Sequence, residues 1–89
     1  MSVARTVQIT NRRGLHARAS AKFVTMAAAQ PIEVSVEKDG SRVTGTSIMG
    51  LMMLGAAKGD HITISASGEG ADAVVGQLAQ LVEDRFGED

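Results

Sequence analysis

The sequence predicts an α+β fold in which an antiparallel sheet is covered on one face by helices. Short segments that alternate apolar and polar residues are typical of strands with one buried face. These segments are interleaved with stretches of helical periodicity, in the order β-α-β-β-α-β-α. At 89 residues the chain has room for one core, so we expect a single domain over residues 1–89.

The composition narrows the classes of function. Hydrophobic residues make up 44% of the chain, with two Phe and no Tyr or Trp, which predicts an aliphatic core. A net charge of −1 gives no global reason to bind nucleic acid or an anionic membrane. The absence of cysteine excludes disulfides, thiolate metal sites and a cysteine nucleophile. Without an apolar leader or a run of membrane-spanning length, we expect a cytoplasmic protein with no membrane insertion.

The first strand and the first helix are expected in the N-terminal third. Apolar residues alternate over residues 3–9, and residues 11–14 supply turn chemistry. Residues 17–29 are rich in helix formers, and Pro31 ends this helix because proline disfavours helical geometry in the residue before it. The apolar face of the helix contains Ala19, Phe23, Met26 and Ala27.

The middle of the chain predicts a hairpin followed by a short apolar helix. Residues 32–36 alternate, residues 38–41 offer a tight turn, and residues 42–45 form the partner strand. Ser47 provides a hydroxyl cap for residues 48–54, which are too apolar and too few for an ordinary surface helix. We therefore expect part of this helix to face solvent or a partner.

The C-terminal third predicts one more strand and one more helix. Residues 61–67 alternate, and residues 67–70 break the strand. The last helix is expected over residues 71–86. Its apolar residues recur at helical spacing: Ala71, Val74, Val75, Leu78, Leu81, Val82 and Phe86.

Chemistry is expected at His16, which stands at the start of the first predicted helix. A lone histidine there is more often a cap or a surface residue, but Gly14 before it permits a tight turn and Arg18 follows it. Free backbone amides and the positive end of the helix dipole bind anions, and the same field disfavours imidazolium. The pattern suits a phosphoryl acceptor, and Arg12 and Arg13 either extend the anion site or remain solvated.

Two motifs carry a resemblance to a known family. The segments GLHAR (residues 14–18) and SIMGLM (residues 47–52) resemble those of the histidine phosphocarrier HPr of the phosphoenolpyruvate-dependent phosphotransferase system, a family that includes the nitrogen-related NPr form. The similarity extends over essentially the whole chain. It implies an open-faced β-sandwich with a four-stranded antiparallel sheet and three helices on one face.

The resemblance also implies a function. His16 would take a phosphoryl group on Nδ1 from phosphorylated enzyme I and pass it to an enzyme IIA domain, while Arg18 stabilises the phosphohistidine. Such a chain is a carrier with a phosphohistidine intermediate, with no cofactor or metal, and we expect a monomer. Both a sugar-uptake and a nitrogen-related branch use such carriers; the acidic residues 86–89 and the methionine-rich second helix resemble the nitrogen-related form.

Further roles follow from the same resemblance. Ser47 matches a serine that an HPr kinase/phosphorylase phosphorylates in some lineages, and it is also expected to cap its helix. Ala19 stands where the family usually has proline; alanine is a good helix former, so we expect the helix start to survive with a little more local mobility and no loss of chemistry. The expected docking residues for enzyme I and enzyme IIA are Leu15, Ala17, Ile48, Met49 and Met52.

Two alternatives remain from other classes. One is a regulatory module of the same fold that docks without phosphoryl transfer, and only the carrier requires a phosphorylatable side chain at position 16. The other is a small nucleic-acid binder using its arginines, which lacks stacking aromatics and a basic surplus. His61, at the start of a predicted strand, receives no functional role, and no ligand spacing predicts a metal site.

Overall fold

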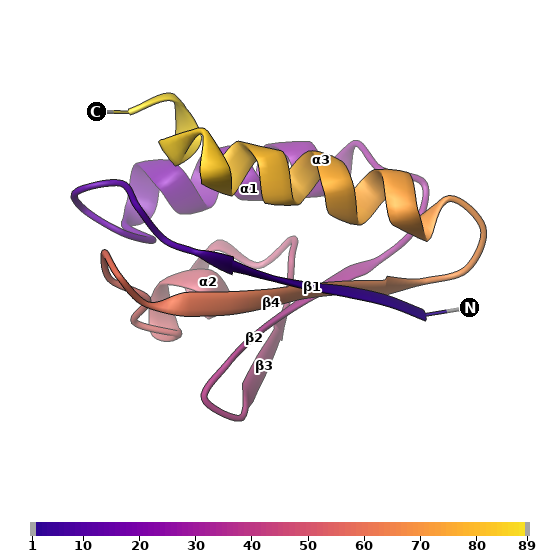
Figure 1. Ribbon diagram of the computed structural model, residues 1–89, viewed down its shortest axis with the longest axis horizontal. Coiled ribbons are helices and arrows are strands. Elements are labelled where there is room, and N and C mark those ends of the chain that lie inside the picture. The colour runs from indigo at the N-terminus through magenta and orange to yellow at the C-terminus, as the bar shows by residue number, and fades with distance from the viewer. Residues whose placement is uncertain (1, 89) are drawn as a thin grey trace.

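Four strands form one antiparallel sheet in the computed structural model, which describes residues 2–88 (Figure 1). The strands are β1 (Ser2–Gln8), β2 (Val34–Lys38), β3 (Ser41–Thr44) and β4 (His61–Ser67). Their order across the sheet is β1-β4-β2-β3, and every neighbouring pair is antiparallel. The first and the last strand in the sequence, β1 and β4, therefore lie side by side.

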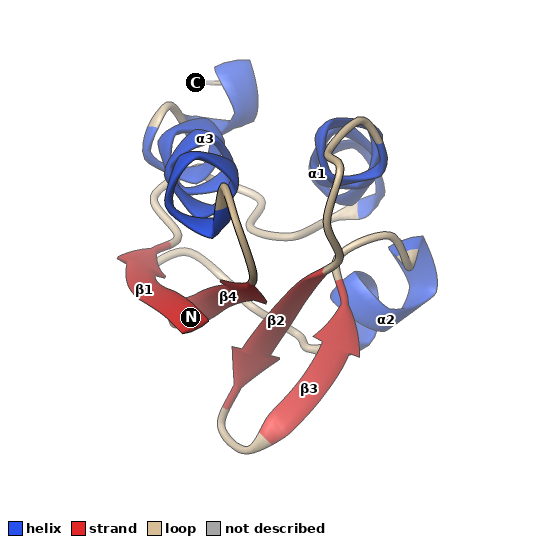
Figure 2. Cartoon of the chain, turned by 90° about the vertical axis from the view of Figure 1, so that its right-hand side faces the viewer, coloured by secondary structure: helices blue, strands red, loops and turns tan. Residues whose placement is uncertain are grey.

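The helices are α1 (Ala17–Ala28), α2 (Ile48–Met53) and α3 (Ala71–Glu83), followed by the 3-10 turn η1 (Arg85–Gly87). Figure 2 shows α1 and α3 over one face of the sheet, with α2 beside β3 and below α1. The α+β class and the element order expected from the sequence are confirmed. Across residues 2–88, each helix falls short of the length and apolar character needed to cross a bilayer.

The hairpin between β2 and β3 forms where the turn residues predicted it. Lys38 pairs with Ser41, and the two residues between them, Asp39 and Gly40, have φ angles of 50° and 87°. Positive φ at both central positions is the geometry of the tight turn whose twist matches that of paired strands. The predicted turn over residues 38–41 is confirmed.

The core lies between the sheet and the two long helices. Alternate residues of β2 and β4, such as Val36 and Ile64, point to the helices and are fully buried, which explains the period-two pattern. Phe23 of α1 and Leu78 of α3 belong to the same core and are also fully buried. Burying an aliphatic or aromatic side chain of this size contributes about 1.5–3 kcal/mol.

The last helix differs from its prediction. The α-helix ends at Glu83, and Phe86 lies in η1 with a φ of 55°, although its side chain is only 1% exposed. Arg85 and Gly87 on either side also have positive φ, so the chain turns back toward the core instead of continuing along the α3 axis. Apolar spacing predicts which side chains are buried but does not fix the path of the backbone. Phe86 is buried as its spacing suggests, but it is brought to the core by η1 and not by a longer α3.

Candidate functional site

The loop that carries His16 is held against the loop that precedes β4. The Leu15 amide donates a hydrogen bond to the carbonyl oxygen of Ala56, at 2.9 Å. Gly14 has a φ of 65°, and a Cβ placed on it would lie 2.4 Å from the same carbonyl oxygen. Only glycine fits this approach, which fixes the direction in which the chain enters α1.

His16 is the N-cap residue of α1, with extended backbone angles (φ −73°, ψ 179°). Its side chain makes no capping hydrogen bond, so the ring is left for other contacts. The first hydrogen bond of the helix runs from the Ser20 amide to the His16 carbonyl oxygen, at 2.9 Å. The amides of residues 17–19 therefore have no acceptor within the helix, which makes this helix end favourable for an anion.

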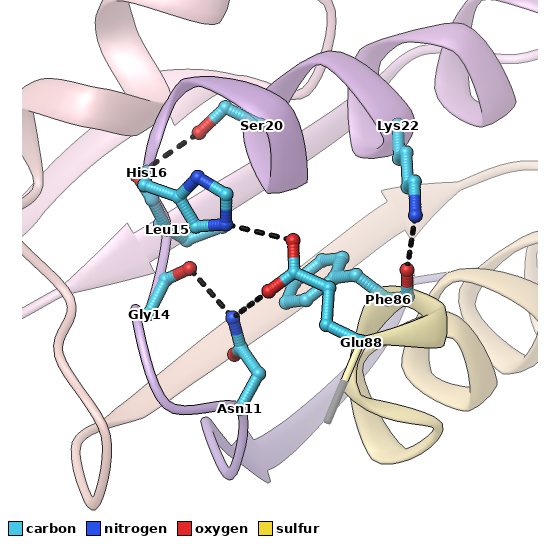
Figure 3. Close-up of polar contacts among 8 residues, drawn as sticks. All are labelled: Asn11, Gly14, Leu15, His16, Ser20, Lys22, Phe86 and Glu88. Carbon is cyan, nitrogen blue, oxygen red and sulfur yellow. Dashed lines mark hydrogen bonds and ion pairs between the residues drawn. The ribbon is translucent and has the colours of Figure 1, made fainter.

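One edge of the imidazole faces the C-terminal segment (Figure 3). Nε2 of His16 lies 2.7 Å from Oε2 of Glu88. The other oxygen of that carboxylate accepts a hydrogen bond from Nδ2 of Asn11 at 3.1 Å, and the same nitrogen donates to the Gly14 carbonyl oxygen at 2.8 Å. Asn11 is fully buried, so this network ties the loop before α1 to the end of the chain.

A shallow, strongly cationic pocket opens beside the ring. Its volume is about 360 Å³, and four of its residues carry a permanent positive charge. The chain as a whole is slightly acidic, so the positive charge is local. The pocket is lined by Arg12, Arg13, His16, Arg18, Lys22, Gly87 and Glu88.

Glu88 is ionised in this setting. Burial, the largest influence on its carboxyl group, acts to raise the pKa, but hydrogen bonds from Asn11 and His16 and attraction to His16 and Lys22 act the other way. Together they hold the pKa of Glu88 below its ordinary value of 4.5. An ionised carboxylate can only accept hydrogen bonds, and Glu88 accepts one from Asn11 at neutral pH.

The second helix exposes an apolar surface, which we call the methionine patch: Ile48, Met49, Met52 and Met53. Met49 is 68% exposed and Met53 is 80% exposed, while Leu51 and Leu54 are buried. Met53 was not predicted as part of this surface. A six-residue helix is too short for its periodicity to show which of four adjacent apolar residues faces solvent.

Leu15 was expected as a docking residue, but the structure places its side chain in the core, at 5% exposure. Ala17, the first residue of α1, is exposed. Both polar backbone groups of Leu15 are engaged, because its carbonyl oxygen accepts from the Ser20 hydroxyl at 3.1 Å and its amide donates to Ala56. Leu15 thus holds the loop before α1 against the core.

Three residues of the site were missed by sequence reasoning: Asn11, Lys22 and Glu88. Lys22 lies in the second turn of α1, where its ammonium group donates to the Phe86 carbonyl oxygen at 2.6 Å. No sequence motif identifies these residues. Glu88, for example, lies close to His16 only because η1 turns the chain back. Arg12, Arg13 and Arg18, by contrast, line the pocket as the anion-site interpretation expects.

Ser47 caps α2 through its hydroxyl, which accepts a hydrogen bond from the Gly50 amide at 2.9 Å. Replacing Ser47 by alanine is expected to lower the free energy of unfolding by about 1 kcal/mol, because that amide loses its acceptor. Ser47→Asp, which retains an oxygen acceptor, is the control and should lose less. Urea unfolding measures both, and an alanine variant as stable as the parent protein would contradict the cap.

Comparison with known proteins gives a consistent result. A family profile described as "PTS HPr component phosphorylation site" matches residues 3–84. The phosphocarrier protein HPr of Neisseria meningitidis serogroup A is 47% identical over 83 residues, covering 93% of each chain. The phosphocarrier protein NPr of Shewanella violacea is 34% identical over 84 residues, covering 94% of this chain and 92% of its own.

Solved structures agree with the sequence relatives. The crystal structure of HPr-C-His from Thermoanaerobacter tengcongensis superposes with a TM-score of 0.91 at 39% identity, covering 98% of each chain. The fold, the matched profile and the relatives all point the same way. This chain belongs to the HPr family, the phosphocarrier proteins of the phosphotransferase system.

Proposed function

We propose that His16 is the residue that carries the phosphoryl group, received from phosphorylated enzyme I and passed to an enzyme IIA domain. One observation supports this above all: the ring of His16 opens onto a pocket lined by three arginines and a lysine, at the N-terminal end of α1. A phosphoryl group brings close to two negative charges, which these cations and the free amides of the helix stabilise.

In the proposed step the lone pair of Nδ1 attacks the phosphorus atom of the donor's phosphohistidine. The P–N bond of the donor breaks, and its electron pair stays on the donor nitrogen. The protein's part is to position the acceptor and to stabilise charge on the phosphoryl oxygens. Arg18 is the proposed partner of these oxygens, since its side chain is exposed and lines the same pocket as the ring.

We propose the methionine patch and Ala17 as the docking surface for both partners. The patch exposes four large apolar side chains, and methionine adapts its shape to different surfaces. Helix α2 packs against α1, the helix that His16 caps, so a partner on the patch reaches the pocket as well. The carrier would work in the cytoplasm, where both partners are proposed to meet it.

A charge placed in the patch is expected to slow transfer without unfolding the protein. Met49→Glu should raise the KM for phosphorylated enzyme I by about tenfold, because a carboxylate then faces the partner's apolar surface at the cost of desolvation. Ala73→Glu adds the same charge at an exposed position of α3 and is the control. Steady-state kinetics with equal effects for the two variants would argue against this docking surface.

Ser47 is the proposed regulatory site. Its hydroxyl lies at the start of α2, next to the methionine patch, so a phosphate there would repel an acidic or phosphorylated partner. An HPr kinase/phosphorylase is the proposed enzyme for this modification. The phosphate would keep its place at the helix start, because its oxygens also accept from the Gly50 amide.

The proposal is tested by incubating the protein with enzyme I and phosphoenolpyruvate and measuring its intact mass. We expect one added phosphoryl group, which is lost in acid, as a phosphohistidine is, and also on addition of an enzyme IIA domain. An unmodified protein that still binds enzyme I would instead favour the docking module, and an acid-stable adduct would move the site to a hydroxyl.

A further inference from the structure

The C-terminal segment contacts the ring of His16 at Nε2 and not at Nδ1. Oε2 of Glu88 lies 2.7 Å from Nε2 of His16, and both side chains are largely buried, at 15% and 21% exposure. A contact this short and this shielded from water is a charge-assisted hydrogen bond rather than a loose surface pair. Figure 3 shows the carboxylate between the ring and Asn11.

Three separate attachments hold Glu88 there. Phe86 is buried in the core, its carbonyl oxygen accepts a hydrogen bond from Lys22, and Asn11 donates to the second carboxylate oxygen. The positive φ angles from Arg85 to Gly87 turn the chain back over α1. The position of the carboxylate is therefore built into the fold and is not a chance contact of a free end.

We propose that Glu88 is a positioning residue for His16, which holds the neutral imidazole in the tautomer with hydrogen on Nε2 and thereby leaves the lone pair on Nδ1. A carboxylate at Nε2 accepts a hydrogen bond and never donates one while ionised, so it selects the tautomer that carries a proton there. The inference rests on the proposed function of His16 and adds a residue to it.

The same carboxylate balances charge during transfer. When Nδ1 of the neutral ring bonds to phosphorus, no proton leaves, so the ring holds both the new N–P bond and the Nε2 proton and becomes cationic. The ionised Glu88 offsets that positive charge at hydrogen-bonding distance, as the carboxylate of a Ser-His-Asp triad offsets an imidazolium. When the group moves on, the N–P bond breaks and the ring returns to the same neutral tautomer.

The lowered pKa of Glu88 sets the range in which this works. Because the folded protein binds the proton less tightly than the unfolded chain, ionised Glu88 stabilises the fold above pH 4.5, and this contribution is lost as the pH falls through the lowered value. The titratable and charged groups around it come from the loop before α1 and from α1: Arg12, Arg13, His16, Arg18 and Lys22. Glu88→Gln should therefore lose less stability than the parent protein on acidification.

The test compares the parent protein with Glu88→Ala and Glu88→Gln, using two-bond ¹H–¹⁵N NMR of the histidine side chains in the unphosphorylated proteins. We expect the Nε2-protonated tautomer of His16 in the parent protein and a mixture of tautomers in Glu88→Ala. Glu88→Gln has one acceptor oxygen for two neighbours. If that oxygen accepts from Asn11, the amide nitrogen donates to Nε2 and favours the opposite tautomer, with hydrogen on Nδ1. His61, the only other histidine, is the internal control, and its tautomer should be the same in all three proteins.

Kinetics of phosphorylation by enzyme I provide the second measurement. Glu88→Ala is expected to lower kcat about tenfold with little change in KM, since a residue acting behind another typically contributes about 10- to 100-fold. Glu88→Gln should lower kcat at least as much, because its neutral amide neither offsets the charge on the ring nor holds the proton on Nε2. Glu69→Ala, which removes an exposed carboxylate, is the control and should behave as the parent protein. An unchanged tautomer and rate in Glu88→Ala would overturn the inference. A parent protein that takes no phosphoryl group at all would instead overturn the proposed function, because the tautomer is measured without it.

Discussion

Replacing His16 by alanine is expected to abolish phosphorylation by enzyme I and to leave the protein folded. The remaining residues of the pocket are arginines, a lysine, a glycine and a glutamate, and none of them replaces a neutral imidazole as the nucleophile. The rate should fall by more than about 10³-fold, as it does when the attacking group of a covalent mechanism is removed. Intact-mass measurement after incubation with phosphoenolpyruvate and enzyme I gives the result directly.

His61→Ala is the matched control for this experiment. His61 is the only other histidine, and it lies exposed at the start of β4, opposite Gln8 of β1. Its loss should leave phosphorylation at the rate of the parent protein. Retention of the phosphoryl group by His16→Ala, or its loss from His61→Ala alone, would remove His16 from the mechanism.

Gly14→Ala is expected to have the largest effect on stability, lowering the free energy of unfolding by about 3 kcal/mol. The left-handed backbone alone costs a non-glycine residue about 1–2 kcal/mol. The added Cβ would in addition lie 2.4 Å from the Ala56 carbonyl oxygen and 2.9 Å from the Cα of Ala57, both of them backbone atoms that yield only if a loop moves. Movement of this loop displaces His16, so phosphorylation should slow as well.

Gly55→Ala separates the two contributions. Gly55 has the same φ of 65°, but a Cβ on it meets no atom within 4 Å. We expect a loss of only about 1 kcal/mol and a normal rate of phosphorylation. Urea unfolding of the two variants compares them, and equal losses would show that the close approach of Gly14 to Ala56 does not hold the loop.

Much of the fold was predictable because strand alternation and turn chemistry are local. The residues that point to the helices from β2 and β4 are apolar, and those between them are not, so the buried face of the sheet is visible in the sequence. The turn at Asp39 and Gly40 likewise depends on two adjacent residues. The order of strands across the sheet was not predicted, since it depends on contacts between distant segments.

The failures concern residues whose surroundings are set at long range. Leu15 was expected at a docking surface because it adjoins His16 in the motif, but the contact of its loop with Ala56 turns its side chain into the core. Phe86 was expected in the last helix, and η1 instead returns it to the core by a left-handed turn. Glu88 became part of the site through the same turn, which no local pattern announces.

The candidate site itself was predictable in part. His16, Arg18 and the two loop arginines lie around one pocket, because they are neighbours along a turn and the first turn of a helix. Asn11, Lys22 and Glu88 complete the site. They are distant in the sequence, and Asn11 and Glu88 are 77 positions apart. Local chemistry therefore indicated the reacting group, while its supporting residues required the fold.

The most direct measurement is the position of the phosphoryl group in the intact phosphorylated protein. With ¹⁵N-labelled histidine, the one-bond coupling between ¹⁵N and ³¹P identifies the nitrogen that is bonded to phosphorus. We predict this coupling at Nδ1 of His16, with Nε2 still protonated and facing Glu88. Coupling at Nε2 of His16, or at either nitrogen of His61, would contradict the account.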